Sequence, residues 1–172
     1  MASKYFNVTG ELTQELLAAG DTVLFTKISL SNVQGLHYCK ADMFIEKKLI
    51  GKFYLFKDIK LPIGGTFLYE GIRFSNKASE FGLYIKLTKS DVFTLTGTIN
   101  VTGTNTDVPG TNTLFLSELS VGDEITVTGE TRTIATITND TTATVTVAWG
   151  SDLDNDLTPD CSPKSEVDII LS

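Results

Sequence analysis

The chain has few of the residues that most often carry out chemistry. Its 172 residues include one histidine, His37, and two cysteines, Cys39 and Cys161. A single histidine cannot supply a histidine-based metal cluster, and no serine or cysteine stands in a nucleophile motif. The glycine pair at residues 64–65 lacks the strand–turn–helix context of a phosphate-binding loop. We therefore expect a structural or surface role for His37 and a protein that is not an enzyme.

Long apolar runs are also missing. No stretch of about 18 apolar residues exists, so the sequence predicts no membrane association. The N-terminal stretch MASKYFNVTGELTQ lacks the apolar segment of a signal peptide, so we expect no export. Both cysteines are then expected to be reduced, and a Cys39–Cys161 disulfide is the alternative.

Positive charge becomes scarce after residue 95. Residues 1–95 contain 12 Lys and Arg against 9 Asp and Glu, whereas residues 96–172 contain 2 against 12. The net charge of −7 argues against general nucleic-acid binding, which needs a basic stripe. Threonine becomes frequent at the same point. These changes predict a docking module over 1–95, a Thr-rich module over 96–150 and an acidic tail over 151–172 that ends in a strand-like run.

The first module has the pattern of an antiparallel β-sandwich. Apolar and polar residues alternate in about seven or eight short segments with turn signals between them. Residues 38–45 and 49–56 predict a hairpin whose polar turn is Glu46-Lys47-Lys48. Glu70-Gly71 predicts a bend or bulge, and residues 15–19 are compatible with one short helical turn.

The second module predicts a small Thr-rich β-barrel or β-sandwich, so the expected fold class is all-β. Residues 128–131 and 138–141 are predicted tight turns. The strand candidates are rich in threonine, which has a high β propensity on the outward face of a strand. They are residues 98–104, 113–115, 124–128, 131–138 and 143–149.

One acidic segment has the spacing of a calcium loop. Asp152, Asp154, Asp156 and Asp160 occupy relative positions 1, 3, 5 and 9, and alternating carboxylates can converge on one hard cation. However, position 6 is Leu157 rather than glycine, and position 12 is not glutamate. We therefore expect an acidic linker and no cofactor, with calcium as the alternative.

Aromatic residues are frequent in the first module, and most alternate with polar residues as the core positions of a sandwich do. Tyr54, Tyr69 and Tyr84 are the ones expected to reach the surface. Such side chains could form a platform for a glycan, so a carbohydrate-binding adhesion module remains an alternative function.

Several segments carry a resemblance to known proteins. In the first module they are KYFNVTG (4–10), TKISLSN (26–32), FYLFKDIKLP (53–62) and GLYIKL (82–87). These resemble a sandwich domain of virion structural proteins from tailed bacteriophages, particularly those of marine bacteria and cyanobacteria. In the second module LSVGDEI (119–125), GETRTIATI (129–137) and TVAW (146–149) resemble a small β-domain of phage head and tail proteins.

The resemblance implies a non-enzymatic virion protein, most directly a capsid decoration or stabilising protein that acts through protein–protein contacts. A neck or tail component is the alternative within this class. The implied partners are other virion proteins, above all the major capsid protein, with association between copies as a homo-oligomer. The implied location is the virion, assembled in the host cytoplasm. The acidic tail lies outside the resemblance.

Overall fold

The computed structural model describes residues 3–21, 24–47, 49–75 and 81–172. It is an all-β chain in which every named strand pair is antiparallel, which confirms the predicted fold class. The chain divides into two compact units. Unit 1 comprises Met1–Lys89 and Ser165–Ser172, and unit 2 comprises Ser90–Lys164.

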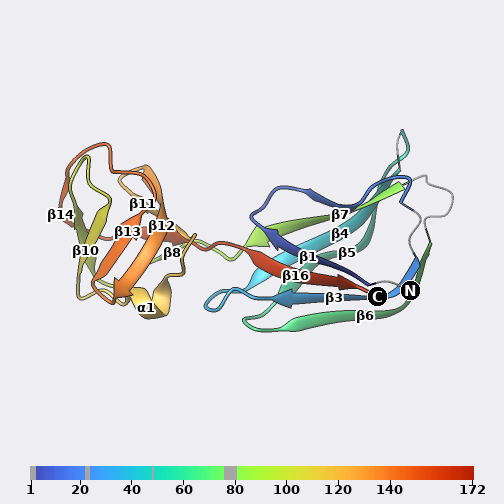
Figure 1. The fold of residues 1–172 in the computed structure, drawn as a ribbon. Helices are drawn as coiled ribbons and strands as arrows, with labels where there is room; N and C mark the ends of the chain where they lie inside the picture. Colours follow the sequence, from blue (N-terminus) through green and yellow to red (C-terminus); the bar gives the residue numbers. More distant parts are fainter. Residues whose placement is uncertain (1–2, 22–23, 48, 76–80) are drawn as a thin grey trace. The chain divides into compact units, whose positions relative to one another are not determined.

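Unit 1 is a sandwich of two four-stranded sheets (Figure 1). The first sheet has the order β1 (Lys4–Thr9), β16 (Glu166–Leu171), β3 (Leu24–Asn32) and β6 (Thr66–Ser75). The second sheet has the order β2 (Gln14–Leu17), β7 (Phe81–Lys89), β4 (Cys39–Lys47) and β5 (Gly51–Leu61).

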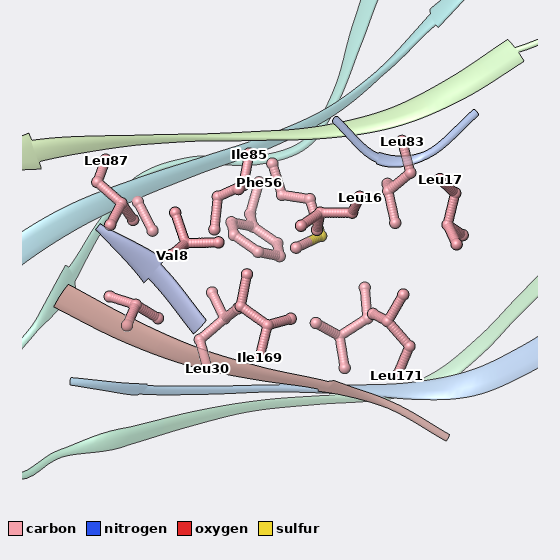
Figure 2. Packing of buried hydrophobic residues seen from close by; sticks show 14 of the residues in the cluster. Val8, Leu16, Leu17, Leu30, Phe56, Leu83, Ile85, Leu87, Ile169 and Leu171 are labelled. Atoms are coloured by element: carbon pink, nitrogen blue, oxygen red, sulfur yellow. The ribbon is translucent and has the colours of Figure 1, made fainter. Parts of the chain in front are cut away.

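The core of unit 1 lies between these two sheets. Figure 2 shows Leu30, Ile169 and Leu171 of the first sheet facing Leu83 and Ile85 of the second. All five side chains are almost inaccessible to solvent. The two-residue period of the strands places these apolar side chains on the inner faces and leaves the intervening polar residues outside.

The C-terminal strand β16 completes unit 1. It pairs with β1 on one side and with β3 on the other, so it is an inner strand of the first sheet. Its side chains alternate between buried and more exposed, with Val167, Ile169 and Leu171 in the core. The first and last segments of the chain are therefore neighbours in one sheet.

Unit 2 is built on one eight-stranded sheet. The order is β14 (Leu153–Leu157), β9 (Thr98–Val101), β10 (Asp107–Thr111), β13 (Thr142–Val145), β12 (Glu130–Asn139), β11 (Glu124–Val127), β15 (Asp160–Ser162) and β8 (Phe93–Thr94). Among the described residues the pairing does not close into a barrel. A short helix, α1 (Phe115–Glu118), inserts Phe115 into the core beneath the sheet.

The structure corrects the predicted division of the chain. The first boundary lies between Lys89 and Ser90 instead of at residues 95–97, because β8 already belongs to the sheet of unit 2. Residues 151–172 do not form a separate acidic tail, since β14 and β15 pair within unit 2 and β16 pairs within unit 1. The charge count compares consecutive stretches of the sequence, so it cannot show which distant strands will pair.

Several local predictions can also be checked. The β11–β12 hairpin turns at Thr128 and Gly129, which both have positive φ (46° and 84°), as a type I′ turn requires. The expected bulge lies in β6, where Gly71 has a φ of 78° and the pairing with β3 shifts register. Residues 14–17 form β2 and not a helical turn.

One other local prediction is wrong, and one strand was missed. Residues 113–115 lead into α1 and do not form a strand. The strand β10 was not predicted because it contains Pro109, which cannot donate to a ladder. Pro109 is accommodated where β10 changes partner: residues up to Pro109 pair with β13, and Gly110 and Thr111 pair with β9.

Candidate interaction surfaces

The acidic segment at 152–160 spans β14 and the start of β15. Asp152 Oδ1 accepts a hydrogen bond of 2.7 Å from the Gly103 amide, and Asp160 Oδ1 accepts one of 2.8 Å from the Thr94 hydroxyl. The side chains of Asp154 and Asp156 lie outside the described residues. No group of three potential metal ligands gathers in the described part of the chain. The calcium site remains a prediction.

The backbone of His37 is hydrogen-bonded within unit 1, and both cysteines are buried. The His37 amide donates to Gln34 Oε1 at 2.5 Å, and its carbonyl accepts from Asn32 Nδ2 at 2.9 Å. Cys39 is buried in unit 1 and Cys161 in unit 2, and both are free thiols, so the alternative disulfide is not formed. Burial raises the pKa of the Cys39 thiol from 9.0 to about 11, which keeps it protonated and unreactive near neutral pH.

An aromatic row crosses the outer face of the second sheet in unit 1. The strand register places Tyr84 of β7, Phe44 of β4 and Tyr54 of β5 directly side by side. The Phe44 ring centroid lies 5.6 Å from that of Tyr84, with nearly parallel planes, and 5.5 Å from that of Tyr54. The third predicted surface tyrosine, Tyr69, lies on β6 of the other sheet, so it is not part of this row.

Tyr84 is held in a fixed orientation beside a hollow. Its hydroxyl donates to Glu15 Oε1 at 2.9 Å, and its ring lies over Gly82, where an added Cβ would meet the ring at 2.8 Å. The hydrogen bond to Glu15, partial burial and the charges of Glu15 and Glu46 raise the pKa of Tyr84. Ala19, Glu46, Gly82 and Tyr84 line a hollow of about 360 Å³.

Lysines of β5 lie over aromatic rings on this unit. Lys52 Nζ is 4.6 Å from the Phe44 centroid, Lys57 Nζ is 5.5 Å from that of Tyr54, and Lys60 Nζ is 3.8 Å from that of Tyr38. These cation–π contacts order the lysine side chains while the ammonium groups remain at the surface. We call these three residues the β5 lysines.

The β4–β5 hairpin ends in an exposed apolar tip. Leu49 is 99% exposed and Ile50 is 61% exposed, and Phe53 is also exposed. We call these three residues the hairpin tip. Of the predicted turn, Glu46 and Lys47 belong to β4 and Lys48 lies outside the described residues; the Ile50 amide donates to the Lys47 carbonyl at 3.0 Å. Leu49 has a φ of 67°, a left-handed conformation that is unfavourable for leucine.

Unit 2 exposes two leucines beside two carboxylates. Leu114, at the N-cap of α1, is 44% exposed and Leu116 is 57% exposed. Asp140 Oδ1 accepts from the Leu116 amide at 3.0 Å, and Glu118, whose carboxylate accepts from the Thr96 amide at 2.9 Å, donates its own amide to the Leu114 carbonyl at 3.0 Å. We call these four residues the leucine patch. The sequence pattern did not single out this patch or the hairpin tip, because it does not distinguish buried from exposed apolar residues.

Comparisons with known proteins do not assign the chain to a family. The chain matches no protein-family model, no curated protein and no solved structure. None of the helices in the described ranges is long and apolar enough to cross a bilayer.

Proposed function

We propose that this protein is a non-enzymatic structural component of a tailed-phage virion, a head decoration protein that binds the major capsid protein through unit 1. The proposal rests on the resemblance of the two β modules to phage particle proteins and on the surfaces described above. Such a protein needs rigid modules and contact surfaces more than a reaction centre.

The contrast in charge between the two units is the observation that carries the proposal. By the observed division, unit 1 contains 12 basic and 10 acidic residues, whereas unit 2 contains 2 and 11. Unit 1 therefore fits an acidic shell, with the β5 lysines as its ordered basic contacts. Acidic outer modules repel one another and keep particles dispersed.

Charge reversal tests which surface binds the particle. Lys57→Glu/Lys60→Glu should reduce the occupancy of this protein on purified particles, and the loss should be smaller at high salt, where the charges are screened. The matched control is Lys27→Glu on the other sheet, where Lys27 forms an ion pair of 3.0 Å with Glu70. Unchanged occupancy of the β5 variant would exclude the β5 lysines as the docking contacts.

Copy number separates the two virion roles. A decoration protein is present in many copies on the head lattice, and its deletion should make particles less stable to heat. A neck or tail component is present in few copies, and its deletion should stop assembly or infection without altering the stability of the head.

The aromatic row favours one second candidate, a carbohydrate-binding module. Tyr84 is fixed by Glu15 and borders a hollow that contains the Glu46 carboxylate, an arrangement that could stack a sugar ring and bind its hydroxyls. Retention on a polysaccharide column that is lost in Tyr84→Ala but kept in Tyr69→Ala would support this candidate. Equal retention of both variants would argue against it.

A further inference from the structure

We infer that the protein associates head to tail with itself, the hairpin tip of one copy binding the leucine patch on unit 2 of a second copy. The inference goes beyond the proposed function, because it names a second copy of this chain as a partner. Of the β5 lysines that are proposed to contact the particle, only Lys52 lies beside the hairpin tip, and the particle-binding test changes the other two, Lys57 and Lys60.

The two surfaces match in their apolar character. The hairpin tip exposes Leu49 and Ile50, and the leucine patch exposes Leu114 and Leu116. An exposed apolar side chain on a protruding turn gains nothing from the fold, and Leu49 also adopts an unfavourable backbone conformation. Exposed apolar side chains of this kind mark an interaction site, which a partner would cover.

The two surfaces also match in charge. At the base of the tip Lys47 pairs with Gly51 and Lys52 pairs with Glu46, so two lysines outnumber one glutamate there. The leucine patch instead includes Asp140 and Glu118, whose carboxylates accept hydrogen bonds from the Leu116 and Thr96 amides, in a unit with only two basic residues. Opposite charges around apolar centres favour contact between unlike units and disfavour contact between two copies of unit 2.

Within unit 1, the tip lies far from the point where the chain leaves the unit. In the β4–β7 pairing Cys39 lies opposite Lys89, whereas Lys47 lies opposite Phe81. The tip is therefore at the end of unit 1 remote from Lys89, where the chain leaves the unit, at a distance of roughly 27 Å along β4. A contact between two different surfaces is heterologous, and repetition of it generates rings or filaments.

Sedimentation velocity on the full chain tests the inference without any particle. The wild-type protein should form larger species as its concentration rises from micromolar toward millimolar, and about 1 M salt should weaken this association. The tip variant Leu49→Gly/Ile50→Ser and the patch variant Leu114→Ser/Leu116→Ser should each weaken it about a hundredfold, since each removes two apolar side chains from the contact.

Both variants are chosen to fold. Glycine suits the positive φ of Leu49, and serine is a favourable residue at the helix N-cap now occupied by Leu114. Ile63→Ser in unit 1 and Val147→Ser in unit 2 remove other exposed apolar side chains, so they are controls that should associate like the wild type.

Mixing the two variants is the decisive step. The tip variant keeps an intact patch and the patch variant keeps an intact tip, so an equimolar mixture should form one-to-one dimers and nothing larger. A wild-type protein that stays monomeric at all concentrations would overturn the inference. So would a mixture that remains monomeric, or controls that lose association as fully as the variants. None of these outcomes affects the particle-binding test.

Discussion

Replacement of Ile169 by alanine should destabilise unit 1 and leave unit 2 unchanged. Ile169 is 1% exposed and lies in the inner strand β16, between β1 and β3. Removing buried methyl groups from such a site costs about 2–5 kcal/mol, so we expect a loss of about 3 kcal/mol in the free energy of unfolding of unit 1. For a domain of about 100 residues this lowers the melting temperature by roughly 12–24 °C.

The chain contains a separate spectroscopic probe for each unit. All five tyrosines lie in unit 1, and the only tryptophan, Trp149, is buried in unit 2. In urea unfolding, the tyrosine transition of Ile169→Ala should shift to lower urea by about 2 M, for a slope of about 1.5 kcal/mol/M. The tryptophan transition should stay in place.

The neighbouring residue provides the matched control. Ile170 is 38% exposed on the outer face, so Ile170→Ala should cost less than about 1 kcal/mol. An equal shift of the tyrosine and tryptophan transitions in Ile169→Ala would show that the two units unfold as one. An unchanged tyrosine transition would show that β16 is not part of the sandwich core.

Three further predictions concern single polar groups. Asp123→Ala should lower the stability of unit 2 by about 2–3 kcal/mol in tryptophan-monitored unfolding, because the fully buried Asp123 carboxylate accepts two backbone hydrogen bonds. Cys39 should resist thiol reagents until unit 1 unfolds. Since its pKa is raised in the folded state, its contribution to stability should be present below pH 9.0 and lost as the pH rises toward about 11. The unfolding free energy of Cys39→Ala should lack this loss between pH 9.0 and about 11. Glu15→Gln should lower the pKa of Tyr84 in an ultraviolet titration, and no change would mean that Glu15 does not hold the phenol.

Local alternation made much of the fold predictable. The alternation of Val167, Ile169 and Leu171 predicted a strand, and these residues form β16. The turn at Thr128-Gly129 follows from its residue types. These features depend on neighbours in the sequence, where a period of two or a glycine with positive φ is visible directly.

Long-range pairing could not be predicted in the same way. The partners of β16 are β1 and β3, more than a hundred residues earlier, and several strands of the chain have equally apolar inner faces. The acidic composition of residues 151–172 suggested a solvated tail, although three strands lie within it. Net charge describes a surface, and it does not determine which backbone groups pair.

The candidate surfaces were the least predictable part. Tyr54 and Tyr84 were expected at the surface, but their alignment through Phe44 depends on the register of three strands. The exposure of Leu49 and Leu116 depends on where two short turns reverse the chain, and a register error of one residue moves a side chain from the core face to the solvent face.

The most direct test of the proposed function is quantitative mass spectrometry of purified virions of the phage that carries this sequence. The account predicts that the protein copurifies with intact particles at a fixed ratio to the major capsid protein, in a number set by the head lattice. Absence of the protein from purified virions would contradict a structural role in the particle.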